Sequence, residues 1–321
     1  MIRKLGLTIT SLLGLAAATG FAAEKTYVFG VVAKSNNNPV FQAAKTGAED
    51  EAKKISHEKG VNVKIDWRTP NEEDPQKQAD AIEQLVNAGA NGIAVSCSDA
   101  NKLTDAIDKA VLSGVPVVTF DSDAPQSKRL TCFGTEDSSC GKQIMDELAK
   151  IMGSKGSVAI LGGNQNAPNL QKRVQAIKEA AKAYPNIEIV DAYYHKETPQ
   201  DAAAKVEQVM QAHPEITGWG MVGGWPLFTD NALKWKPGTV KVVAVDALPA
   251  QLDYLRSGHV QELLAQQVYK WGTTSIDVLY DAVANNKQPA TSFIKADLIP
   301  VTKDNVDAFA KNWDKWLGKN K

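Results

Sequence analysis

VPVVTFDSDA, residues Val115–Ala124, begins as an apolar and β-branched run and ends in two aspartates around one serine. A short run of this kind, bounded by polar turn residues, is typical of a buried strand. Asp121 follows the run directly, and Asp123 comes two residues later. An aspartate in this position either caps a turn or faces a ligand. The stretch alone leaves both interpretations open for each aspartate.

Strand-like runs and helical runs alternate along most of the chain. Three strand–helix units and a fourth strand precede Gly153, and a similar series restarts after it. Gly60, Gly89 and Gly114 each stand between a helical run and the next strand, as left-handed helix caps do. Alternation of this kind requires parallel strands joined by crossover helices. The sequence therefore predicts an α/β protein with two similar, doubly wound parallel-sheet lobes, joined by short direct crossings.

The segments that follow the predicted strands are the first place to look for a site, because open parallel sheets bind ligands at the carboxyl ends of their strands. In the first lobe these segments are KSNNNP, WRTP, CSD and DSD, and in the second they are GGNQN, YYHKE, GGWP and DALP. Amides and carboxylates supply hydrogen-bond donors and acceptors, and aromatic rings cover the apolar face of a sugar ring. The set favours a small polyhydroxylated ligand.

The composition is that of an exported globular protein. The chain has 321 residues, 43% of them hydrophobic, and a formal net charge of −1, which gives no basic footprint for nucleic acid. Arg3 and Lys4 precede an apolar run that ends in small residues near Ala23. This order predicts a signal peptide over residues 1–23 and a mature protein in the periplasm. The apolar run is short for a membrane span, so an uncleaved anchor is the less favoured alternative.

The sequence offers little that would support catalysis. G-x-S-x-G, H-E-x-x-H and P-loop patterns do not occur, and only His195 of the four histidines lies at a strand end. Gly218–Gly223 fits G-x-G-x-x-G, but it occupies a predicted strand rather than a strand-to-helix turn. We therefore expect no enzyme activity, no cofactor and no metal; turnover of a sugar by the purified protein would revive a hydrolase or an oxidoreductase.

Three cysteines are present, and an exported protein can keep a disulfide. Cys132 and Cys140 bound the short segment CFGTEDSSC, and a bridge between them is one of two interpretations left open, with Cys97 then an unpaired buried thiol. The other interpretation is that all three are free thiols. No C-x-x-C pair supports a zinc or redox role.

Three segments carry a resemblance to a known family: GVVAKSNNNPVFQAAKTGAEDEAKK, GVPVVTFDSDAP and VVAVDALPAQLDYLRSGHVQELLAQ. With the predicted signal peptide and lobes, the chain resembles periplasmic sugar-binding proteins of the ribose/galactose type, the type I binding components of ABC importers, over about Glu24–Lys321. The resemblance implies a monomer whose lobes, joined by three hinge crossings, close on a monosaccharide and deliver it to an ABC permease/ATPase complex. The implied lobes are 24–135 plus about 267–296, and 136–266 plus about 297–321.

Two other functions share this fold. A sensor for a sugar-like signal, acting on a chemoreceptor without transport, would look the same in sequence. The effector domain of a sugar-responsive repressor is disfavoured by the signal peptide and by the absence of an N-terminal helix-turn-helix.

The expected ligand-binding residues come mostly from the resemblance, and Lys34 is added as a polar group at the end of the first strand. They are Lys34, Asn38, Phe41, Asp121, Arg173, Trp225, Asp246 and Gln266. Asn38 should bond sugar hydroxyls and Phe41 should stack on the ring, whereas Asp123 should be structural. Val40 and Gln171 replace a family aromatic and a family arginine, and Gly-Gly-Trp ending at Trp225 replaces Gln-Asn-Asp. Weaker candidates are Trp67, His195 and Glu197.

Overall fold

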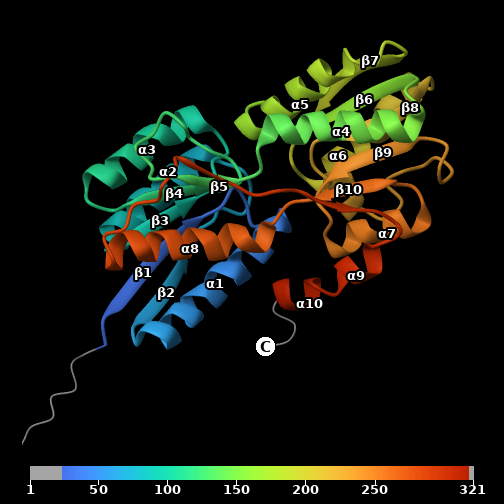
Figure 1. Cartoon of the computed structure of the whole chain (residues 1–321). Helices are drawn as coiled ribbons and strands as arrows, with labels where there is room; N and C mark the ends of the chain where they lie inside the picture. Colours follow the sequence, from blue (N-terminus) through green and yellow to red (C-terminus); the bar gives the residue numbers. More distant parts are fainter. Residues whose placement is uncertain (1–23, 318–321) are drawn as a thin grey trace, which may run out of the picture.

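The computed structural model describes residues 24–317, so the predicted signal peptide lies outside the described residues. Two lobes lie side by side, each built on a six-stranded sheet with helices on both faces (Figure 1). The predicted α/β architecture of two doubly wound lobes is confirmed. Among the described residues, no helix combines the length and apolar character that crossing a membrane requires.

The N-terminal lobe has the strand order β11-β5-β4-β3-β1-β2, and all of its pairings are parallel. Helices α1 and α8 pack together on one face, and α2 and α3 on the other (Figure 1). The elements are β1 (Thr26–Val32), α1 (Val40–Lys59), β2 (Asn62–Trp67), α2 (Pro75–Asn87), β3 (Gly92–Val95), α3 (Ala100–Leu112), β4 (Val117–Phe120), β5 (Cys132–Gly134), α8 (Val268–Ala284) and β11 (Phe293–Lys295).

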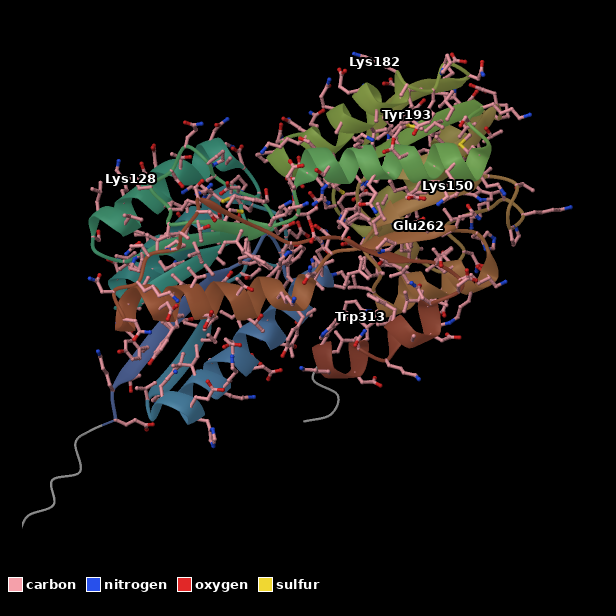
Figure 2. The ribbon with its side chains drawn as sticks, viewed as in Figure 1. Lys128, Lys150, Lys182, Tyr193, Glu262 and Trp313 are labelled. Atoms are coloured by element: carbon pink, nitrogen blue, oxygen red, sulfur yellow. The ribbon has the colours of Figure 1, made fainter. Side chains whose placement is uncertain are left out.

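The C-terminal lobe repeats this plan with the order β12-β10-β9-β8-β6-β7, in which only the edge strand β12 is antiparallel among the described pairings. Figure 2 shows Lys128 and Lys182 on the outer surfaces of the two lobes, away from the region between them. The elements are α4 (Asp137–Met152), β6 (Gly156–Gly163), α5 (Pro168–Ala181), β7 (Ile187–Tyr194), α6 (Pro199–Ala212), β8 (Ile216–Met221), the 3₁₀ turn η1 (Trp225–Phe228), β9 (Lys241–Val245), α7 (Pro249–Ser257), β10 (Glu262–Ala265), β12 (Ile299–Val301), α9 (Val306–Ala310) and α10 (Trp313–Trp316).

Local sequence explains where these elements begin and end. All four residues of β4 are buried, as its unbroken apolar run predicts for a strand covered on both faces. Asp74 and Asp99 cap α2 and α3 by accepting bonds from backbone N–H groups of the first turn. Gly60, Gly89 and Gly114 have φ of 62°, 79° and 83°, so the predicted left-handed glycines are confirmed.

The chain passes between the lobes three times, after β5, after β10 and after β11 (Figure 1). The three-crossing hinge is therefore confirmed. The first two crossings touch each other, because Thr135 Oγ1 donates to Gln266 Oε1 over 3.2 Å.

Two expectations about local structure are tested directly. The disulfide interpretation for Cys132 and Cys140 is wrong: all three cysteines, Cys97 included, are free and buried. Cys132 lies in β5 of the N-terminal sheet, whereas Cys140 lies in α4 and packs into the core of the other lobe, so the short segment between them spans the first crossing. The glycine motif ending at Gly223 lies largely within β8, as its apolar pattern predicted.

Candidate functional site

The strand-end aspartates Asp121 and Asp246 occupy the same position in the two lobes. Asp121 follows β4 directly, and Asp246 follows β9 directly. Their φ angles are 58° and 79°, a left-handed region that aspartate enters more readily than most residues. Each extends its sheet by a backbone N–H bond to the next strand, to Phe133 and to Leu264. The carboxylates are thereby held at the sheet edges from which the hinge crossings leave.

The polar residues that gather between the lobes share a position in the fold: each comes directly after a strand. They are Ser96, Asp121, Thr135, Asn164, His195, Asp246 and Gln266. Their location agrees with the rule that open parallel sheets bind ligands at the carboxyl ends of their strands.

Arg173 reaches from α5 into the centre of this group, and the residue is only 2% exposed. Its guanidinium donates to the Val222 carbonyl over 3.0 Å, to Gln266 Oε1 over 2.8 Å and to Asp137 Oδ1 over 2.8 Å. Burial lowers its pKa, but nearby acidic groups, Cys140 and Asp137 first among them, raise the pKa above its ordinary value. Arg173 is therefore a permanent cation held in one orientation.

Gln266 connects this cation to the hinge. Its Oε1 accepts from both Arg173 and Thr135, and its Nε2 donates to Asp246 Oδ1 over 2.8 Å. Burial raises the pKa of Asp246, although the bond from Gln266 opposes the shift. Because Thr135 and Gln266 belong to two different crossings, hydrogen bonds connect Asp246 and Arg173 directly to the hinge.

Two residues link Asp121 to the C-terminal lobe. Asn169, which is 3% exposed, donates from Nδ2 to Asp121 Oδ1 over 3.3 Å. Lys34 Nζ lies 4.0 Å from Asp121 Oδ2 and 3.5 Å from Glu197 Oε1 across the lobe boundary. Burial lowers the pKa of Lys34, but the carboxylates of Glu197 and Asp121 outweigh burial and raise it above its ordinary value. The lobes are thus held together by a buried ion-pair network.

A second interlobe contact brings two carboxyl groups together, and sequence reasoning missed half of it. Glu197 follows β7 and Glu73 precedes α2 of the other lobe. The Glu197 side chain is 4% exposed, and burial together with the neighbouring Glu73 raises its pKa to about 8. Asn164 Nδ2 donates to Glu73 Oε2 over 2.9 Å. Asn164 stands in the strand-end segment GGNQN, but no pattern distinguished Glu73.

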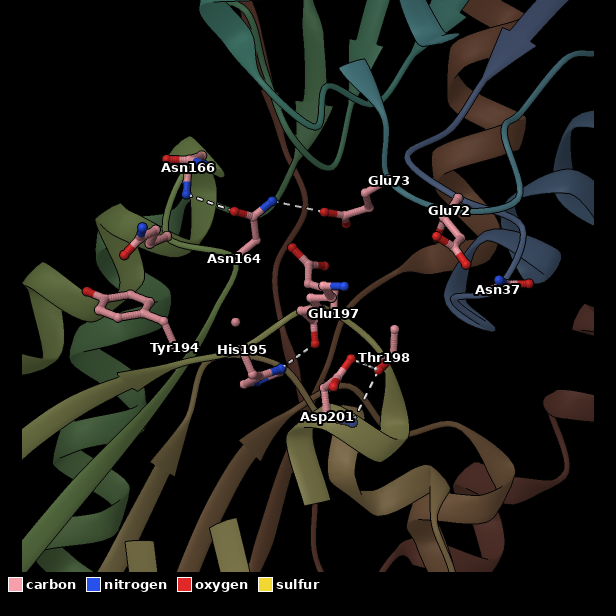
Figure 3. Close-up of a pocket in the computed structure, with 14 residues that line it drawn as sticks. Asn37, Glu72, Glu73, Asn164, Asn166, Tyr194, His195, Glu197, Thr198 and Asp201 are labelled. Atoms are coloured by element: carbon pink, nitrogen blue, oxygen red, sulfur yellow. Dashed lines mark hydrogen bonds between the residues drawn. The ribbon is translucent and has the colours of Figure 1, made fainter. Parts of the chain in front are cut away.

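A cavity of about 660 Å³ adjoins this contact (Figure 3). Both lobes line it, and the eight residues expected from the sequence are not among the described residues that do so. The lining residues are Ser35, Asn37, Glu72, Glu73, Gly163, Asn164, Gln165, Asn166, Tyr194, His195, Lys196, Glu197, Thr198 and Asp201. Glu197 belongs to the cavity wall and also pairs with Lys34, so it joins the cavity to the buried network.

Trp225 is placed by two glycines. A Cβ at Gly163 or at Gly223 would overlap its indole ring, so the Gly-Gly-Trp departure from the family pattern makes room for the ring. Trp225 is 5% exposed and meets His195 edge-on, with 5.1 Å between ring centroids. Its ring thus packs against a residue of the cavity wall.

The remaining expected residues lie apart from this network. Phe41 is 1% exposed and packs against Phe120 and Trp271 in the core, with centroid distances of 6.5 and 6.0 Å. Asn38 is buried at the start of α1, where its Oδ1 accepts from the backbone N–H of Val40 over 3.4 Å. Ligand contact by any of the eight expected residues stays a prediction.

Asp123, which was expected to be structural, and Trp67, a weaker ligand-binding candidate, both form hydrogen bonds or ion pairs within the N-terminal lobe. Asp123 forms an ion pair with Arg129 and accepts from Thr119 Oγ1 over 2.6 Å, which agrees with the structural role expected for it. Trp67 donates from its indole nitrogen to Asn36 Oδ1 over 2.9 Å. Within residues 24–317, no group of three or more histidine, cysteine, aspartate or glutamate side chains is arranged to hold a metal ion. The arrangement is suited to holding a polar ligand by hydrogen bonds.

Known proteins share both the sequence pattern and the fold. The family model for the periplasmic binding protein domain matches residues 29–288. The chain is 28% identical over 310 residues to the D-allose-binding periplasmic protein of Escherichia coli, covering 91% of this chain and 97% of that protein. It is also 28% identical over 200 residues to the ribose import binding protein RbsB of Bacillus subtilis, but that match covers only 60% of either chain.

A solved structure agrees with the described fold. The ABC transporter solute-binding protein from Burkholderia graminis in complex with D-arabinose has a TM-score of 0.81 and 28% identity, covering 88% of this chain and 98% of that one. The chain belongs to the periplasmic binding protein family. The resemblance to its ribose/galactose type, inferred from the three quoted segments, is confirmed.

Proposed function

We propose that the protein captures a monosaccharide between its two lobes and delivers it to an ABC permease, without catalysing a reaction. The observation that carries this proposal is the convergence of hydrogen-bonding groups from both lobes and the hinge. Asp121 comes from one lobe, Asp246 and Arg173 from the other, and Gln266 from the second crossing. A ligand that forms hydrogen bonds with groups on both lobes stabilises the closed form. Closure of two domains about a hinge around a ligand is a common conformational change.

The residue types suit hydroxyl groups. Carboxylates and the guanidinium form charge-assisted hydrogen bonds, which are stronger than bonds between neutral groups. The two relatives reported above are named for binding D-allose and importing ribose, and the similar solved structure is a complex with D-arabinose. Export through the predicted signal peptide would place the protein in the periplasm, where such ligands meet the transporter.

Binding is tested by a thermal-shift screen of the mature chain against monosaccharides and polyols. A ligand that binds only the folded state raises the melting temperature. Asp121→Asn, which keeps the side-chain shape and tolerates the left-handed backbone, should weaken binding of the best ligand by about tenfold to a hundredfold, since a hydrogen bond to a charged group contributes about 1.5–3 kcal/mol. Asp105→Asn, on the exposed surface of α3, is the matched control.

Two results would count against the proposal. The absence of a shift with every sugar and polyol would contradict sugar capture, and an unchanged affinity in Asp121→Asn would contradict the site. Delivery is tested separately, by uptake of the identified sugar into cells with and without the chain.

A further inference from the structure

The wall of the 660 Å³ cavity presents buried acceptor atoms that receive no hydrogen bond. Glu73 Oε1, Glu197 Oε1 and His195 Nε2 are each buried and make no hydrogen bond among the described residues. Of the three, Glu197 Oε1 faces the Lys34 ammonium at 3.5 Å as an ion pair. His195 Nδ1 lies 2.5 Å from the Lys196 carbonyl, which can only accept, so Nδ1 carries the hydrogen and Nε2 presents a lone pair. Burial also lowers the pKa of His195, which keeps the ring neutral. These positions of the wall therefore offer acceptors to a ligand.

The charges around the cavity point the same way. Glu72, Glu73, Glu197 and Asp201 line it, against one lining lysine, the exposed Lys196. Lys34 lies behind Glu197 and is shared with Asp121. Asp201 accepts from the Thr198 hydroxyl over 2.7 Å (Figure 3). Among the acids that line the cavity, Glu73 and Glu197 each have a buried oxygen without a hydrogen bond.

Ionisation of Glu197 is costly in this arrangement. Burial and the neighbouring Glu73 oppose its negative charge, and Lys34 offsets only part of this cost because it also faces Asp121. This agrees with the pKa of Glu197, which burial and Glu73 raise to about 8. A neutral sugar leaves that cost in place, whereas a positive group between the two carboxylates lowers it.

We propose that this cavity is a subsite for an ammonium group on the bound sugar, so that the preferred ligand is an amino sugar. An ammonium has three N–H donors. They are enough for Glu73 Oε1 and His195 Nε2, which have neither a hydrogen bond nor an ion pair, and for Glu197 Oε1, which has only the ion pair with Lys34. The inference rests on the proposed function, because the sugar ring itself would lie against the buried network that Glu197 joins to the cavity.

The test compares matched ligands by calorimetric titration at pH 7. The pairs are D-glucosamine with D-glucose and D-galactosamine with D-galactose, and the N-acetyl derivatives serve as neutral amides of nearly the same shape. Spermidine tests for a polyamine as the source of the ammonium group. The amino member of at least one pair should bind at least tenfold more tightly than its hydroxyl partner, and N-acetylation should remove the gain.

Variants show whether the gain comes from this cavity. Glu73→Gln and Glu197→Gln should each reduce the amino preference to threefold or less while the hydroxyl sugar still binds. Glu83→Gln, on the exposed face of α2, should keep the full preference. Unliganded melting temperatures identify any variant that fails to fold, and since Glu73 and Glu197 lie on different elements, either variant alone tests the subsite.

The outcomes separate this inference from the proposed function. If hydroxyl sugars bind as tightly as amino sugars, or if the amino preference survives in both glutamine variants, the ammonium subsite is wrong and sugar capture stands. If spermidine binds more tightly than every amino sugar, the sugar-borne ammonium is wrong. If no sugar of either kind binds, the proposed function itself fails.

Discussion

Ionisation of Glu197 should weaken the closed arrangement of the lobes as the pH rises. In this structure the lobes touch through the Lys34–Glu197 ion pair and the Asn164–Glu73 hydrogen bond, and this arrangement is called the closed form. Burial and Glu73 raise the pKa of Glu197 from 4.5 to about 8 here, whereas separation of the lobes returns the carboxyl to water and to its ordinary value. A group with the higher pKa in the closed form binds more protons there. The closed form is therefore favoured at low pH, loses stability between about 4.5 and about 8, and loses no more above that window.

The change in the free energy of closure is set by the loss of one proton, that of Glu197. Each pH unit inside the window removes up to about 1.4 kcal/mol from closure. Raising the pH from 6 to 8 thus removes about 2–3 kcal/mol, on the order of a hundredfold in the ratio of closed to open molecules. The groups that face Glu197 are Glu73, Lys34 and Asp121, and the ion pair with Lys34 opposes but does not cancel the shift.

Small-angle scattering of the unliganded protein at pH 6, 7, 8 and 9 measures this change as an increase in the radius of gyration. Glu197→Gln, which stays neutral, should remain compact over the whole range. Glu262→Gln is the matched control, because burial and Glu147 raise the pKa of Glu262 to about 7 although it lies in β10, and this variant should respond as the wild type does. A flat wild-type profile, or an equal response in Glu197→Gln, would refute the argument.

Three further predictions concern packing and the thiols. Gly223→Ala places a Cβ against the Trp225 indole and should weaken ligand binding and lower the free energy of unfolding by about 1–3 kcal/mol, measured by titration and by urea denaturation. Gly272→Ala in α8 drives a Cβ into the backbone of Ala44 and its neighbours in α1; it should destabilise by a similar amount without changing ligand preference, and full wild-type stability would show that the helices can separate. Burial raises the pKa of Cys140 to about 12, so none of the three buried thiols should react with a thiol reagent at pH 7.5, and all three should react in denaturant.

Periodicity was enough to predict the lobes, because long buried strands and amphipathic helices leave patterns in the sequence. The short strands β5, β11 and β12 leave none, since three residues are too few to show an alternation. The segment after β8 forms only a four-residue 3₁₀ turn, Trp225–Phe228, which ends where Thr229 turns to an extended backbone. Hydrophobic pattern alone does not specify such an end.

The strand-end rule was the stronger guide to the site, and its limits are physical. It pointed to Asp121 and Asp246, because position after a parallel strand is a local property that the sequence displays. Gln266 was expected only from the family resemblance. The strand-end rule could not identify Glu73, which lies in the loop beyond WRTP and gains its role only from Glu197 in the other lobe. The different roles expected for Asp121 and Asp123 agree with their partners, which are Asn169 of the other lobe for Asp121 and Arg129 for Asp123.

The contacts that single out Glu197 form only when the two lobes come together, and no sequence motif indicates them. Glu197 was a weak candidate from the sequence, because the match to the family pattern is poorly aligned at this position. In the closed arrangement Glu197, from the C-terminal lobe, lies against Lys34 and Glu73 of the N-terminal lobe. It also forms part of the cavity wall. A charge placed there must be neutralised by Lys34, by a proton or by the ligand. Lys34 is shared with Asp121, so the choice between a proton and a cationic ligand connects the pH dependence of closure to the identity of the sugar.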